Sequence, residues 1–167
     1  MRRIYPFTFY TLSLAAILST FFSTYTLRAE VLSDGERLFK QAVSLEKSGD
    51  YKNALKAALK SIESLENDYG KECLPVARAS NQLGLIYKHL GKYSKSISVL
   101  EYSLYLTEQL MGPKHYMVAT VLNNLALVYE ILGNYEKALA LFTKAYEIRK
   151  KRLKEGDPYI GQSLNNI

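Results

Sequence analysis

The sequence predicts an all-α solenoid, in which antiparallel helix pairs stack side by side. Three observations lead to this prediction. Gly49, Gly91 and Gly133 recur at a constant interval, their numbers differing by 42 each time, and each is followed two positions later by tyrosine. The stretches between them have apolar residues at helical spacing. Hydrophobic residues make up 48% of the 167 residues, which is ample for a solenoid core.

The unit TVLNNLALVYEILGNYEKALALF, from Thr120 to Phe142, shows the repeated pattern most fully. Gly133 divides it, because glycine readily takes the left-handed conformation at the end of a helix. Asn134 then follows as a residue that can cap a second helix. If Thr120 is position 2, four residues of the first helix share one face at positions 4, 7, 8 and 11: Leu122, Leu125, Ala126 and Tyr129.

The second helix of the unit has small residues on either side of one large residue. Ala138 and Ala145 flank Phe142 on one face of this helix. Two helices that cross at about 8 to 10 Å need small residues at the contact and a large residue to fill the remaining space. The unit therefore predicts a helical hairpin, with small residues on both helices where they meet.

These residues resemble the tetratricopeptide repeat, whose first helix carries Leu, a small residue and Tyr, and whose second helix carries Ala, Phe and Ala. The interval of 42 and the linker GPKHYMVA are similar to the longer repeats of kinesin light chains and their bacterial relatives. The resemblance covers about Leu38 to Ile167. It implies a right-handed α-solenoid that binds proteins or peptides. Position 8 is occupied by Ala42, Gly84 and Ala126, and position 20 by Ala54, Ser96 and Ala138.

The repeat interval divides the chain into two parts. We expect a repeat domain over 30–167, with repeats at about 36–77, 78–119 and 120–161. The segment LNNI at the end of the chain repeats the earlier LNNL, so 162–167 is expected to begin a truncated fourth repeat. Two explanations remain open: the chain is the N-terminal fragment of a longer scaffold, or a short form self-associates through this repeat.

Residues 1–29 have the pattern of an export segment. Arg2 and Arg3 precede an uncharged run from Ile4 to Leu27, and Ala29 stands at a plausible cleavage point. A cleaved signal peptide would make the repeats periplasmic or secreted. The run is also long enough for a hydrophobic leader helix that anchors the chain as a single-pass protein. In both cases the repeats would lie outside the cytoplasm, since the arginines stay inside.

The charge of the chain argues against a nucleic-acid partner. The net charge is +6, and three of the arginines, Arg2, Arg3 and Arg28, belong to the predicted export segment. The remaining basic residues are scattered, whereas a nucleic-acid binder gathers them on one face. The exception is a basic cluster between Arg149 and Lys154. We expect it to be a solvated helix end, with an anionic lipid or an acidic partner as the alternative.

No motif for catalysis or metal binding is present. His89 and His115 have no recurrent carboxylate or cysteine at metal-ligand spacing, and Cys73 is the single cysteine. Phosphate-binding loops and hydrolase motifs are also missing. The sequence therefore predicts a chain without enzymatic activity, metal or cofactor, and with a protein or peptide as its partner.

Polar residues recur on the first helix of each repeat, opposite the face predicted to be core. An amide side chain offers both a donor and an acceptor, so a column of amides could pair with the backbone of an extended peptide. The resemblance implies the same role. Alternatively, these residues are simply an exposed polar surface. The predicted groove residues, none of them expected in the core, are Arg78, Asn81, Gln82, Lys88, Thr120, Asn123, Asn124, Asn165 and Asn166.

Overall fold

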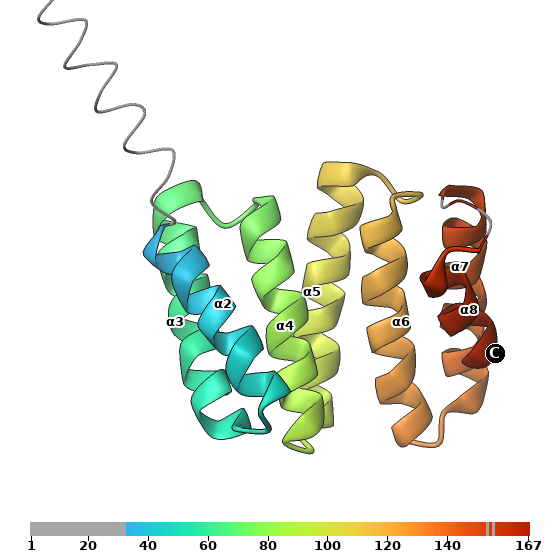
Figure 1. Cartoon of the computed structure of the whole chain (residues 1–167), viewed down its shortest axis with the longest axis horizontal. Coiled ribbons are helices and arrows are strands. Elements are labelled where there is room, and N and C mark those ends of the chain that lie inside the picture. The colour runs from blue at the N-terminus through green and yellow to red at the C-terminus, as the bar shows by residue number, and fades with distance from the viewer. Residues whose placement is uncertain (1–32, 153, 155) are drawn as a thin grey trace, which may run out of the picture. The chain divides into compact units, whose positions relative to one another are not determined.

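The computed structural model describes residues 33–152, 154 and 156–167, and the predicted leader lies outside them. In this part of the chain all regular structure is α-helical, as predicted (Figure 1). None of its helices is both long enough and apolar enough to span a bilayer. The helices are α2 (Asp34–Lys47), α3 (Tyr51–Tyr69), α4 (Leu74–His89), α5 (Tyr93–Met111), α6 (Tyr116–Ile131), α7 (Tyr135–Arg152) and α8 (Pro158–Asn165).

The helices form hairpins that stack in chain order. The pairs α2 with α3, α4 with α5, and α6 with α7 make the largest contacts, and α3 with α4 and α5 with α6 join successive pairs. The first helices of neighbouring hairpins also touch, α2 with α4 and α4 with α6. Figure 1 shows this row of hairpins, with α8 beginning the next one against α7. The residues from Ser33 onward therefore form the predicted solenoid.

Glycine ends the helices at a regular interval. At Gly133 the backbone φ is +76°, its N–H bonds to the Glu130 carbonyl, and the Asn134 N–H bonds back to the Tyr129 carbonyl at 2.9 Å. These two hydrogen bonds satisfy carbonyl groups that would otherwise be unpaired at the end of the helix. The Asn134 side chain then accepts from the Lys137 N–H at 3.2 Å, so the predicted cap is confirmed. Positive φ recurs twice in each of the three repeats, at Gly49 and Gly70, at Gly91 and Gly112, and at Gly133 and Gly156.

The predicted small residues lie where the two helices of a hairpin meet, next to a large residue. Ala126 and Ala138 are buried in one cluster with Phe142. In the preceding repeat Gly84 lies against Leu100, and a Cβ atom at Gly84 would stand 2.5 Å from the Leu100 Cγ. The Ser96 hydroxyl donates to the Gly84 carbonyl at 2.7 Å. Small residues at positions 8 and 20 therefore let the helices meet closely.

Arg149 joins the last two helices. It is 3% exposed, and its Nη1 donates to the Ser163 hydroxyl at 2.7 Å and to the Tyr159 carbonyl at 3.3 Å. Burial lowers the pKa of this guanidinium, and the neighbouring Tyr159 and Asp157 act in the opposite direction. The expectation that the basic cluster is wholly a solvated helix end is thus wrong for Arg149, because α8 packs over it.

Candidate functional site

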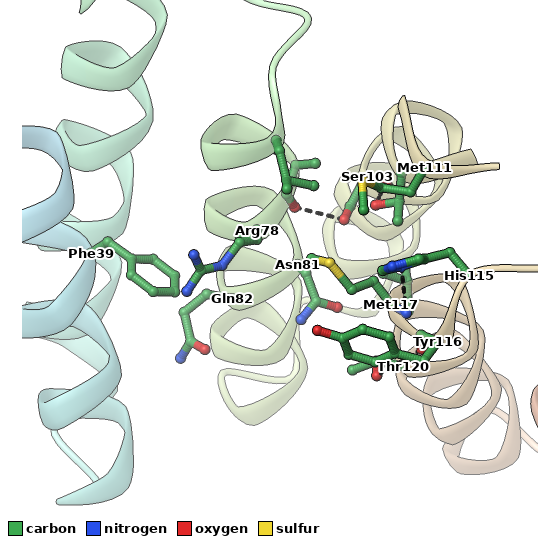
Figure 2. Close-up of a pocket in the computed structure, with 14 residues that line it drawn as sticks. Phe39, Arg78, Asn81, Gln82, Ser103, Met111, His115, Tyr116, Met117 and Thr120 are labelled. Atoms are coloured by element: carbon green, nitrogen blue, oxygen red, sulfur yellow. Dashed lines mark hydrogen bonds between the residues drawn. The ribbon is translucent and has the colours of Figure 1, made fainter. Parts of the chain in front are cut away.

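A hollow of about 590 Å³ opens on the side of the first helices, between α2, α4 and the beginning of α6 (Figure 2). We call it the first-helix hollow. Four of the nine predicted groove residues line it: Arg78, Asn81, Gln82 and Thr120. Its full lining is Phe39, Leu74, Ala77, Arg78, Asn81, Gln82, Ser103, Thr107, Met111, His115, Tyr116, Met117, Thr120 and Val121.

The predicted amides bond to one another across neighbouring repeats. The Asn124 amide N–H donates to the Asn81 side-chain carbonyl at 2.9 Å, and joins α6 to α4. One repeat later, Asn166 donates to Asn123 in the same way at 2.9 Å. In both pairs, position 6 of one repeat donates to position 5 of the preceding repeat. The amides therefore form a ladder that links consecutive first helices.

Two predicted groove residues are buried, which corrects the expectation that none is in the core. Asn123 is 4% exposed and Gln82 is 8% exposed. The helical count placed these positions opposite the hairpin partner, but each first helix is also flanked by the first helices of the adjacent repeats. Alanine at Asn123 would leave the half-buried Asn166 amide without its acceptor, and losing this hydrogen bond costs about 0.5 to 1.5 kcal/mol. Its effect on ligand binding would be confounded by lost stability.

The ladder is interrupted at Gln82. By the repeat register its amide would donate to position 5 of the first repeat, where Phe39 stands. The Gln82 Nε2 is buried without a hydrogen-bond partner among the described residues. The Arg78 guanidinium lies over the Phe39 ring, 5.3 Å from its centroid, above Gln82 in Figure 2. An unsatisfied donor of this kind is costly, so the site favours an acceptor.

The remaining predicted residues lie around the hollow or apart from it. Lys88 and His89 follow at the C-terminal end of α4, where His89 Nε2 is 3.1 Å from a Glu46 carboxylate oxygen. Burial lowers the pKa of Lys88, while Glu46 acts in the opposite direction. Asn165 is exposed on α8. The structure therefore gathers Arg78, Asn81, Gln82 and Thr120 into one hollow but leaves Lys88 and Asn165 outside it.

Sequence reasoning missed the apolar walls of the hollow. Met111, Tyr116 and Met117 come from the end of α5 and the beginning of α6, and Phe39 comes from α2. The repeat pattern describes the core positions of each hairpin, so it singled out neither the helix ends nor Phe39, which stands at position 5 of the first repeat. The signal that could have found Met111, Tyr116 and Met117 is the concentration of methionine and tyrosine in LMGPKHYM.

The described residues contain no cluster of three or more His, Cys, Asp or Glu side chains that could bind a metal ion. The walls of the first-helix hollow are mostly apolar, with amides, hydroxyls, His115 and the Arg78 guanidinium among them. Such a lining suits an apolar ligand group with carbonyl or carboxylate acceptors.

Solved structures similar to this chain are repeat proteins of the same architecture. BtubC (BKLC) from P. vanneervenii is 24% identical, with a TM-score of 0.73 over 79% of this chain and 53% of that one. A putative kinesin light chain with nearly identical TPR-like repeats from Podosopora anserina is 16% identical, with a TM-score of 0.70 over 80% and 64% of the two chains. This chain thus spans about half to two thirds of their lengths.

A search of curated protein sequences gave no significant match. The family model described as Tetratricopeptide repeat matches residues 36–104 and 75–151. Together these two overlapping matches extend over more than half of the chain and include most of the three predicted repeats. The chain therefore belongs to the tetratricopeptide repeat family.

Proposed function

We propose that this chain is a non-enzymatic binding module that holds an extended peptide or protein segment in the first-helix hollow. Tetratricopeptide repeats generally mediate protein–protein interaction, which supports this class of activity. The observation that carries the proposal is the buried Gln82 donor beside a hollow of about 590 Å³. A ligand acceptor that reaches this donor would remove an energetic cost of the free protein.

The walls of the hollow fit an apolar side chain of the ligand. Met111 and Met117 line it together with Phe39. Methionine side chains are flexible and polarisable, so they adapt to apolar groups of different shapes. The Asn81–Asn124 bond uses the carbonyl of one amide and the N–H of the other. The N–H groups of the Asn81 amide and the carbonyl of the Asn124 amide can then bond to the ligand backbone.

The charges along α4 favour acidic residues in the ligand. Arg78 is exposed at the hollow, and its guanidinium can form two parallel bonds to a carboxylate. Lys88 follows nearly three turns later on the same helix, and an acidic neighbour would offset the burial that lowers its pKa. The partner class is therefore an extended segment with an apolar side chain next to an acidic one.

Selection of peptides from a random displayed library against the purified chain tests this proposal. We expect enriched peptides to pair apolar and acidic residues, and Arg78→Glu to weaken the best of them at least about ten-fold, or about 1.4 kcal/mol. The matched control is Lys56→Glu, which makes the same charge change at an exposed position of α3. Isothermal titration calorimetry gives both affinities. Equal binding by the Arg78 and Lys56 variants would contradict the assignment of the site.

We also propose that the chain is exported, on the basis of Arg2, Arg3 and the uncharged run from Ile4 to Leu27. These residues lie outside the described part of the structure. A fusion of residues 1–32 to a reporter that is active only outside the cytoplasm tests the proposal. A fusion without reporter activity would contradict export.

A further inference from the structure

A second hollow, of about 280 Å³, is strongly basic. It lies between the α5–α6 turn and α7, and four cations line it: Lys114, Lys144, Lys151 and Arg152. We call it the basic notch. Of the described carboxylates, Glu108 lies 3.4 Å from Lys144, and Glu147 lies 4.0 Å from Lys151. Two carboxylates against four cations leave an excess of positive charge in the notch.

The equivalent surface one repeat earlier carries acidic and aromatic residues where the basic notch carries lysines. By the repeat register Glu72 and Tyr102 correspond to Lys114 and Lys144, and Glu66 corresponds to Glu108. We define the acidic notch as Glu66, Glu72, Tyr102 and Tyr105. Lys71 precedes Glu72 in the sequence, and its backbone carbonyl accepts from the Tyr102 hydroxyl at 3.2 Å.

The groups of the acidic notch lie close together and are accessible. Burial raises the pKa of Tyr102, and the nearby carboxylates of Glu66 and Glu72 raise it further. Tyr102 is 37% exposed and Tyr105 is 52% exposed. Carboxylates pair with ammonium and guanidinium groups, and the faces of aromatic rings attract the same cations. The acidic notch therefore carries carboxylates and aromatic rings that can bind the charged groups of Lys144, Lys151 and Arg152.

We propose that the basic notch of one copy binds the acidic notch of a second copy, and that the chain forms a two-fold symmetric dimer in this way. Both notches adjoin turns between repeats, α3–α4 and α5–α6, which lie at the same edge of the solenoid in Figure 1. A two-fold axis between the notches makes both contacts at once and closes the assembly. The proposal is independent of peptide binding, since no residue that defines either notch lines the first-helix hollow.

The dimer should be weak and sensitive to salt. Exposed ion pairs each contribute little, so several must act together. Sedimentation velocity of the purified chain tests this. We expect dimers at about 0.05 M salt and monomers at about 1 M, where the Debye length falls to about 3 Å. A chain that stays monomeric at low salt, or dimerises equally at both salt concentrations, would overturn the proposal.

A charge swap identifies the surfaces. The first variant, Lys144→Glu with Lys151→Glu, makes both notches acidic, and the second, Glu66→Lys with Glu72→Lys, makes both basic. Each alone should be monomeric, while an equal mixture should form a heterodimer, because both contacts are then complementary. Lys40→Glu with Lys47→Glu on α2 is the control, since it changes the net charge as the first variant does.

Circular dichroism melting confirms that each variant is folded before sedimentation. The control should dimerise as the wild type does, and all variants should keep the affinity for a selected peptide. A mixture that remains monomeric, or a first or second variant that dimerises alone, would overturn the proposal. Neither result would bear on the peptide site, which is measured separately.

Discussion

Replacing Gly84 with leucine will lower the free energy of unfolding by about 1 to 3 kcal/mol or more, the usual cost of overpacking a close-packed core. The reason is the contact between α4 and α5. Even a Cβ atom at Gly84 would stand 2.5 Å from the Leu100 Cγ and 2.7 Å from its Cδ2. Leu100 is itself fully buried, so it has little room to move. Urea unfolding followed by circular dichroism measures the change.

Gly161→Ala is the matched control, because it adds a Cβ atom to a helical glycine that has no neighbour within 4 Å of that atom. We expect it to be neutral or to stabilise α8 by up to about 1 kcal/mol, since alanine is the better helix former. Gly84→Ala should fall between the two, as Ala42 and Ala126 occupy the same position of the other repeats. An unchanged urea midpoint for Gly84→Leu would mean that α4 and α5 do not meet at this position.

The helices and their ends could be predicted because the signals for them are local. The second helix of the second repeat runs from Tyr93 to Met111 in the structure, between Gly91 and Gly112 of the sequence. The helical spacing of apolar residues, the glycine at each end and the capping residue all lie within the sequence of one hairpin. Lys92 precedes α5 without a capping hydrogen bond from its side chain, and lysine is not among the residue types that usually cap a helix.

The candidate site was predicted less well because it depends on contacts between repeats. A count of about 100° per residue describes one helix against its hairpin partner, and so it placed Asn123 and Gln82 on an open surface. Both are buried, since consecutive first helices touch along this side. The hydrogen bonds from Asn124 to Asn81 and from Asn166 to Asn123 join position 6 of one repeat to position 5 of the preceding repeat, not two equivalent positions. Periodicity alone gives no reason for that offset.

The shape of the first-helix hollow depends on parts of the chain that do not repeat. Met111 and Met117 border the α5–α6 turn, and Phe39 breaks the amide ladder that the other repeats maintain. The sequence shows that Phe39 departs from the pattern. Only the packing shows the consequence, which is that the Gln82 donor is left without a partner among the described residues. The exception to the repeat, more than the repeat itself, gives this hollow its chemistry.

Replacing Phe142 with alanine will have the largest effect on stability, about 3 to 5 kcal/mol, because it removes a buried aromatic ring and leaves a cavity. Phe142 is 3% exposed and belongs to the core cluster that also contains Leu100, Ala126 and Tyr129. This cluster joins the second repeat to the third. Losing the ring should therefore weaken the stacking of the hairpins as well as the α6–α7 hairpin.

Phe142→Leu is the matched control, since leucine occupies the same position in the second repeat as Leu100. It keeps most of the apolar volume, so we expect a smaller loss than for alanine. Urea unfolding measured by circular dichroism gives both values. A loss below about 1 kcal/mol for Phe142→Ala would contradict the close packing around the ring, because so large a deletion is cheap only where the neighbours can collapse into the space that it leaves.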